Sequence, residues 1–346
     1  MRPRPLYLAL MVTLFVSCEE YYHPVLEQVP GMMVVESRLT NDPKQNFVRL
    51  SMTRNFNSTD AVEWITSAKI ELMEVKGKTT SASQIQPGYY TFQETPVTGK
   101  AYVLKISYQN DIFESDPVVM PPMPTIDALY ALHKDDKVYR TNAYGVPELF
   151  TIPGREISID ATLSPELQNF LFSWRTIILW KTYPPNPPKY GWKSFYDEGN
   201  FNLCARQDYS ISDKINHHPL FSLAYNSQKY LDSPDYISDN WIVIIDQYGI
   251  SEKSYKYHKK LNMQLSAEAS LFEPQVSQVY GNVHCKNNPS KIILGYFDVN
   301  SYRQYRYYLN LGLSEKSTVV LRKLNTYPHI PASGDTIAKP KFWESN

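Results

Sequence analysis

The sequence lacks an excess of charge of either sign. Its 346 residues include 35 basic and 35 acidic side chains, so the net charge is zero when histidine is neutral. A domain that binds nucleic acid usually carries a clear basic excess, clustered on one face. We therefore expect no nucleic-acid partner.

The short motifs that mark common catalytic and cofactor sites are also missing. There is no HExxH zinc motif, no GxSxG nucleophile motif, no Walker loop and no GxGxxG segment after an expected strand. The neighbouring histidines His217 and His218 would not share a face in regular structure, which disfavours a metal site. The oxygen-rich stretch Asp232–Asn240 lacks the glycine and the final glutamate of a calcium loop. We expect a protein that is not an enzyme, with no catalytic residues, no metal ligands and no cofactor.

The apolar run near the start is too short to cross a membrane. Leu6–Val16 falls well below the roughly 20 apolar residues that a spanning helix needs. It follows Arg2 and Arg4 and ends at the small residue Ser17. A basic start, a short apolar core and a small residue at the end are typical of a secretory signal peptide, here residues 1–17.

The first cysteine directly follows this segment. Leu14–Cys18 resembles the lipobox of bacterial lipoproteins, although Phe15 stands where leucine is usual. The two glutamates after Cys18 resemble the export signal that sends lipoproteins of Bacteroidota to the cell surface. We expect Cys18 to be acylated and residues 18–30 to form a tether on the outside of the outer membrane. For Cys18 the alternative is an ordinary signal peptide that is cut elsewhere, or a buried free cysteine. For the two glutamates it is a solvated, flexible tether.

Cysteine is otherwise rare. If Cys18 carries lipid, Cys204 and Cys285 remain, an even number in an oxidising export compartment. We predict a disulfide between them. Two buried free thiols are the alternative.

Glycine is scarce beside tyrosine and proline, with 13 glycines against 27 tyrosines and 25 prolines. Such a composition favours strands and packed loops over helix bundles. Within residues 31–120, apolar and polar side chains alternate with a period of two, as at Val48, Leu50 and Met52. We predict a small antiparallel β-sandwich for this segment.

Three prolines in Val119–Pro124 interrupt regular pairing, so we place a domain boundary after residue 120. Residues 121–346 are predicted to form a larger, mainly-β domain with one main helix at Ser251–Ala269, capped by Ser251. We predict separate strands at Ile292–Val299 and Tyr302–Leu311 near its end.

The stretch 180–196, WKTYPPNPPKYGWKSFY, is rich in aromatic residues and stiffened by four prolines. We treat it as a candidate binding loop, because rigid aromatic side chains often form recognition surfaces. The alternative is that these side chains cover the core of the second domain. Its aromatic residues are Trp180, Tyr183, Tyr190, Trp192, Phe195 and Tyr196.

Several short motifs, in this order, resemble one family. They are Met33–Ser37 (MVVES), Met120–Pro122 followed by Ile126–Asp127, Tyr280–Cys285 (YGNVHC), Leu294–Phe297 (LGYF) and Lys339–Trp343 (KPKFW). The chain resembles, over nearly all of residues 18–346, the surface lipoproteins of Bacteroidota grouped as domain of unknown function 4249. This resemblance implies genes beside TonB-dependent outer-membrane receptors and supplies no catalytic residues. The first domain also looks like the transthyretin-like modules attached to such receptors.

Together these observations predict a lipid-anchored outer-membrane protein that helps a TonB-dependent receptor capture a ligand. The alternative is a structural or assembly factor bound to an outer-membrane barrel, and a glycan-active enzyme is a third hypothesis. An accessory and an assembly factor differ in what deletion removes: uptake of one compound, or envelope integrity.

Overall fold

The computed structural model describes residues 31–324 and 336–337. Short gaps fall at 55–57, 59–60, 142–143, 153, 182–189, 197–200, 210–212, 225–239, 267–277 and 311–317. The expected signal peptide, Cys18 and the expected tether therefore lie outside the described residues. The described part is mainly β, with one α-helix, as the composition predicts.

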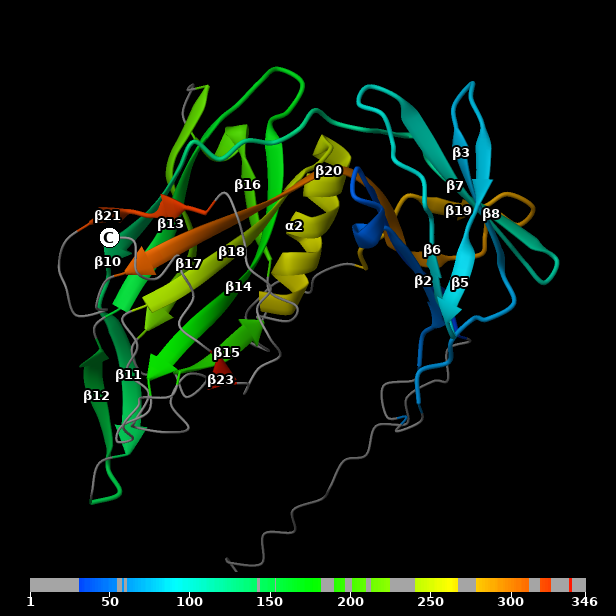
Figure 1. Ribbon diagram of the computed structural model, residues 1–346. Coiled ribbons are helices and arrows are strands. Elements are labelled where there is room, and N and C mark those ends of the chain that lie inside the picture. The colour runs from blue at the N-terminus through cyan, green and yellow to red at the C-terminus, as the bar shows by residue number, and fades with distance from the viewer. Residues whose placement is uncertain are drawn as a thin grey trace, which may run out of the picture.

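The first half of the molecule is a β-sandwich of two sheets (Figure 1). Alternate side chains such as Val48, Leu50, Leu104 and Ile106 are buried between the sheets, which confirms the predicted alternation. One sheet contains β1 (Met33–Thr40), β2 (Phe47–Met52), β5 (Ser83–Gln86), β6 (Tyr89–Thr91) and the first part of β20 (Ile293–Asn310). The other contains β3 (Lys69–Glu74), β4 (Thr79–Ser81), β7 (Ala101–Tyr108), β8 (Asp111–Ser115), β9 (Val118–Val119) and β19 (Val283–Cys285).

The sandwich is not made from residues 31–120 alone, and this corrects the expected boundary. Val283, Cys285, Phe297 and Val299 belong to the same buried core as the first strands. β20 pairs with β1 in parallel, from Met33 opposite Ile293 to Thr40 opposite Asn300, so the sandwich is not wholly antiparallel. A parallel neighbour must come from a distant part of the chain, because a tight hairpin cannot supply it.

The second half forms another pair of sheets around a separate core, which includes Leu129, Ile157, Phe170, Phe172 and Ile245. One sheet holds β14 (Asn169–Lys181), β15 (Tyr190–Tyr196), β16 (Asn202–Ala205), β18 (Asn240–Gly249), β22 (Arg322–Lys323), β23 (Thr336–Ile337) and the end of β20. The facing sheet holds β10 (Ala128–His133), β13 (Gly154–Thr162), β17 (Lys214–Ala224) and β21 (Val319–Val320). A hairpin of β11 (Asp136–Thr141) and β12 (Pro147–Ile152) projects beside it (Figure 1).

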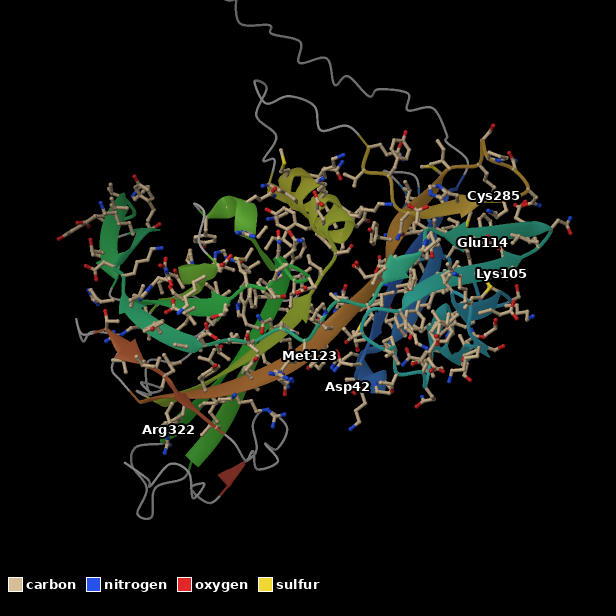
Figure 2. The ribbon with its side chains drawn as sticks, turned by 90° about the horizontal axis from the view of Figure 1, so that it is seen from above. Asp42, Lys105, Glu114, Met123, Cys285 and Arg322 are labelled. Atoms are coloured by element: carbon tan, nitrogen blue, oxygen red, sulfur yellow. The ribbon has the colours of Figure 1, made fainter. Side chains whose placement is uncertain are left out.

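One long strand joins the two halves, so that one sheet of each half belongs to a single continuous 11-stranded sheet. β20 pairs with β1 through Asn300 and with β18 from Ser301 onward, so the two expected strands at 292–299 and 302–311 are a single strand. The proline-rich crossover leaves the first core at Met120 and enters the second at Ile126. Figure 2 shows Met123 between the halves, with Cys285 on the sandwich and Arg322 on the far side of the second half.

The main helix, α2 (Glu252–Ser266), lies between the halves (Figure 1). The backbone N–H of Ser254 donates to Ser251 Oγ at 3.1 Å, so the predicted cap is confirmed. Ser254 and Tyr255 are buried, whereas Tyr257 is only partly buried. Short 3₁₀ turns occur at Pro43–Gln45 and Arg206–Asp208. Within the described ranges, no helix has the length and apolar character needed to cross a membrane.

Candidate binding site between the sandwich and helix α2

The register of three strands arranges polar side chains in rows on the outer face of the sandwich. Phe47 of β2 is opposite Arg38 of β1, and Arg38 is opposite Asp298 of β20. Two positions along, Glu36 of β1 is opposite Tyr296 of β20. Because side chains alternate along a strand, the residues between them on β1 and β20 point into the sandwich core.

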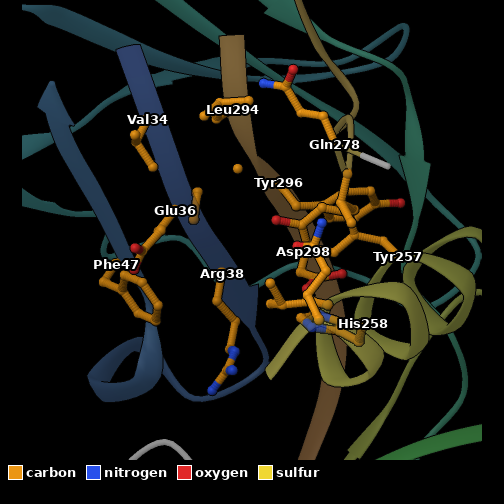
Figure 3. Close-up of a pocket in the computed structure, with 15 residues that line it drawn as sticks. Val34, Glu36, Arg38, Phe47, Tyr257, His258, Gln278, Leu294, Tyr296 and Asp298 are labelled. Atoms are coloured by element: carbon orange, nitrogen blue, oxygen red, sulfur yellow. The ribbon is translucent and has the colours of Figure 1, made fainter. Parts of the chain in front are cut away.

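Helix α2 lies over the β20 end of these rows and closes one side of a cavity. The cavity has a volume of ≈ 420 Å³. This lies within the range typical of small-molecule sites, which are usually lined by apolar walls and a few polar groups. Figure 3 shows side chains from β1 and β2 on one side and side chains from β20 and α2 on the other. The lining includes Val34, Glu36, Arg38, Phe47, Tyr257, His258, Leu261, Leu294, Tyr296 and Asp298.

A buried histidine–carboxylate pair lines this cavity on the side formed by α2 and β20. His258 Nε2 lies 2.7 Å from Asp298 Oδ2, and the two side chains are only 14% and 6% exposed. The Phe201 ring meets the His258 ring edge to face, with centroids 5.6 Å apart. His258 Nδ1 and Asp298 Oδ1 are both buried and have no hydrogen-bond partner within the described part of the chain. Unpaired buried polar atoms are costly, typically about 1–3 kcal/mol each, and are uncommon in folded proteins.

Two tyrosines form an aromatic wall next to this pair. The Tyr257 and Tyr296 rings stack with centroids 4.5 Å apart and planes at 26°. Burial, helped by the nearby Asp298 carboxylate, raises the pKa of Tyr257 to about 12. The same two causes raise the pKa of Tyr296. Both rings therefore remain neutral near pH 7 and present apolar faces with hydroxyl groups at their ends.

The opposite side of the cavity carries a cation that has no carboxylate partner. The Arg38 guanidinium lies 4.4 Å from the Tyr248 ring centroid and 5.7 Å from that of Phe47. Its Nε is buried without a hydrogen-bond partner. The neighbouring Glu36, in contrast, is ion-paired with Arg49 of β2. Among the described residues Arg38 therefore interacts with Tyr248 but with no carboxylate, and one oxygen of Asp298 on the same face has no hydrogen-bond partner.

A second buried polar cluster lies in the core of the C-terminal half. Tyr209 is hydrogen-bonded through its hydroxyl to His218 Nδ1, and His218 Nε2 lies 2.5 Å from Asn202 Oδ1. Burial raises the pKa of the adjacent Cys204 thiol and lowers the pKa of His218 to about 4. The thiolate is the nucleophilic form of cysteine, so this Cys204 is not an activated nucleophile despite its polar neighbours.

The predicted disulfide is wrong. Cys204 and Cys285 are both free and buried. Cys204 on β16 belongs to the core of the second half, whereas Cys285 on β19 pairs with Phe113 in the sandwich. The two thiols therefore occupy different cores. An even number of cysteines therefore does not by itself place two of them close together.

The aromatic stretch at 180–196 begins and ends in strands, which pair with each other in antiparallel fashion. It is therefore not a loop throughout. Trp180 lies on β14, one residue before its end, and Trp192 on β15 is opposite Leu179 of β14. Tyr190, Phe195 and Tyr196 share β15. Tyr183 and the side chains of all six aromatic residues lie outside the described part, so their role as a binding surface stays a prediction.

Sequence reasoning missed Arg38, His258 and Asp298. The polar residues of the alternating β1 segment could have indicated an outward face, but the pairing of β1 with β20 joins positions about 260 residues apart and leaves no local signal. The described residues contain no group of three or more histidine, cysteine or carboxylate side chains that could hold a metal ion.

Comparison with known proteins agrees with the motifs. No curated protein matches the chain. The family described as "Domain of unknown function (DUF4249)" matches residues 19–306, from just after Cys18 to a point within β20. This match covers most of the chain and includes every strand of the sandwich, so the protein belongs to the DUF4249 family.

Proposed function

We propose that this protein is a lipid-anchored outer-membrane protein, exposed at the cell surface, that captures a ligand as a non-enzymatic accessory of a TonB-dependent receptor. The cavity between α2 and the sandwich is the observation that carries this proposal. It is of ligand size, has apolar and aromatic walls and contains unpartnered polar atoms. These are features of a binding pocket.

The proposed location rests on the N-terminal sequence. A short basic segment and an apolar run precede Cys18, and two glutamates follow it. Each acyl CH₂ buried in a bilayer contributes about 0.8 kcal/mol, so two or three acyl chains on Cys18 would hold the protein firmly at the membrane. The receptor partnership rests on the resemblance to surface lipoproteins of Bacteroidota.

Membrane fractionation tests the anchor. Cys18→Ser is expected to release the protein from membranes or to leave an uncleaved precursor. Cys285→Ser, a matched substitution at a buried thiol, is expected to leave the protein in the membrane fraction. A processed Cys18→Ser protein that stays on membranes would contradict the anchor.

Co-purification tests the partnership. The tagged protein, extracted from outer membranes in mild detergent, is expected to bring down one TonB-dependent receptor. Deletion of the gene is expected to reduce uptake of one class of compound and to leave general envelope integrity intact. A general envelope defect, with an assembly-type barrel as the partner, would support the alternative function.

An exposed hairpin favours that alternative, a structural or assembly factor bound to an outer-membrane barrel. In the described part of the chain, β11 and β12 pair only with each other. Tyr139, Leu149 and Phe150 on the hairpin are 74%, 47% and 38% exposed. Large apolar side chains gathered on a projecting element often mark a protein-binding surface.

The hairpin can be tested separately from the cavity. The double variant Tyr139→Ser with Leu149→Ser is expected to keep the melting temperature but to reduce co-purification of a barrel partner if the hairpin is the docking surface. Ile85→Ser, which changes an exposed apolar residue on the sandwich, is the control. Unchanged co-purification with both variants would remove the support for the assembly role.

A further inference from the structure

We propose that the cavity binds a small zwitterion, with a primary ammonium group at Asp298 and His258 and a carboxylate at Arg38. Its chemical class is an amino acid or a short peptide. This inference rests on the proposed ligand-binding function and specifies its ligand.

The first argument is the separation of opposite charges on one face. Arg38 and Asp298 are register partners on neighbouring strands, yet they form no ion pair with each other. Arg38 instead contacts the Tyr248 ring, and Asp298 contacts the imidazole of His258. Buried or partly buried charges are normally paired. A ligand with both charges would pair each of them.

The second argument is the hydrogen-bond polarity at the Asp298 end. A carboxylate only accepts hydrogen bonds, so His258 Nε2 carries the hydrogen that is donated to Asp298. In the neutral ring His258 Nδ1 is then an acceptor, as is Asp298 Oδ1, and both atoms have no partner. Two acceptors beside a negative charge suit a primary ammonium group, which carries three donors.

The third argument is the geometry at the Arg38 end. The guanidinium is placed over the Tyr248 ring, 4.4 Å from its centroid, and this contact helps to hold it in position. A planar guanidinium with a free Nε–H recognises a carboxylate through two parallel hydrogen bonds. The nearby Glu36 does not compete for Arg38, because it is ion-paired with Arg49.

The remaining walls suit a hydrocarbon side chain. Val34 and Leu294 are register partners at one end of the cavity, and Leu261 of α2 and Phe47 of β2 add further apolar surface. The volume of ≈ 420 Å³ leaves room for more than one amino-acid residue. A dipeptide with an apolar side chain is therefore the preferred probe.

Isothermal titration calorimetry with matched dipeptides tests the assignment. Alanyl-leucine is expected to bind, and its N-acetylated and C-amidated forms are each expected to bind about 10- to 100-fold more weakly, as charged hydrogen bonds of this kind are typically worth. Asp298→Asn and Arg38→Met are each expected to weaken binding of alanyl-leucine by a similar factor. Asp111→Asn and Arg206→Met, which change ion-paired surface residues outside the cavity, are expected to have no effect.

The variants should also show which end of the ligand they contact. In Asp298→Asn, acetylation of the dipeptide should no longer matter, and in Arg38→Met amidation should no longer matter, because each variant removes the partner of that group. His258→Gln should weaken the free dipeptide more than the acetylated one. Melting curves of each variant identify any that lose binding through unfolding, and the comparison of blocked with free ligand on the wild-type protein needs no variant.

Three outcomes would overturn the zwitterion, and the third leaves the accessory role intact. One is equal binding of the free, acetylated and amidated dipeptides. Another is that maltose, a neutral probe, binds in a way that depends on Asp298, while alanyl-leucine does not bind. The proposed ligand capture would then remain, but for another class of ligand. The third is that neither probe binds while the receptor still co-purifies.

Discussion

The side chain of Asn282 binds the backbone of Phe297 with both ends of its amide. Asn282 Nδ2 donates to the Phe297 carbonyl at 3.0 Å, and the Phe297 N–H donates to Asn282 Oδ1 at 2.9 Å. Both residues are buried. Asn282 thus makes the two hydrogen bonds that a neighbouring strand would otherwise make with β20 at this point. Phe297 lies between Tyr296 and Asp298, which line the cavity.

Asn282→Ala is expected to lower the free energy of unfolding by about 2–4 kcal/mol, because it leaves a buried N–H and a buried C=O unpaired. Urea denaturation measures this change. Asn288→Ala, at an exposed asparagine in the following turn, is the control and should change stability by less than about 0.5 kcal/mol. Equal effects of the two substitutions would show that the paired amide is unimportant.

Two glycines near Asn282 and Phe297 allow close contact between backbone segments. Gly295 on β20 has φ +91°, and a Cβ there would collide with the Val35 carbonyl of β1. A Cβ at Gly281 would collide in turn with the Gly295 carbonyl. The three segments 33–37, 280–285 and 294–297, which carry the family resemblance, therefore meet at one point of the sandwich.

Gly295→Ala is expected to cost roughly 3 kcal/mol or more of stability, because it combines left-handed backbone strain with a clash against backbone. Gly99→Ala separates these two causes. Gly99 has φ +82°, but a Cβ there would meet nothing within 4 Å. Its cost should therefore be the strain alone, about 1–2 kcal/mol. A Gly295→Ala protein as stable as Gly99→Ala would mean that β1 can move away from β20 at little cost.

The mainly-β class, the cap of α2 and several strands were predictable, because each depends on a local pattern. β14 and the alternation around Val48 and Leu50 are examples. The assignment of β19 and β20 to the sandwich was not predictable, since pairing of β1 with β20 depends on contacts across most of the chain. The same long-range pairing places Arg38 beside Asp298. The sequence therefore could not predict that these residues lie together in one site.

The cysteine count shows how a compositional argument fails. An even number of cysteines in an exported chain favours a disulfide only if the fold brings the two residues together. Cys204 and Cys285 lie in separate cores. Their small apolar character, which suits burial, explains their positions without a bond.

Thiol labelling checks this correction. In the Cys18→Ser protein, where only Cys204 and Cys285 remain, neither thiol should react readily with iodoacetamide in the native state, since both are buried. Both should react in urea without any reductant. A reductant should leave the urea midpoint unchanged. Failure of both thiols to label in urea until a reductant is added would restore the disulfide.

The buried His218 predicts a loss of stability in mild acid. Burial lowers the pKa of its ring to about 4 in the folded protein, against an ordinary value of 6.5. The unfolded chain therefore takes up a proton near pH 6.5, whereas the folded protein does so only near pH 4. The contribution of the neutral ring to stability is complete above pH 6.5 and is lost as the pH falls towards 4. Each pKa unit corresponds to about 1.4 kcal/mol, so the loss approaches about 3 kcal/mol.

Urea denaturation at pH 7 and pH 4 tests this prediction in His218→Gln. The variant has no ring to protonate, so its stability should fall by up to about 3 kcal/mol less than that of the wild type between the two pH values. His284→Gln makes the same substitution at an exposed histidine and should keep the wild-type pH dependence. The variant at 218 also loses the hydrogen bonds to Tyr209 and Asn202, which lowers stability at both pH values and cancels in the difference. Parallel pH profiles for His218→Gln and the wild type would show that acid sensitivity arises elsewhere, among the carboxylates of the fold.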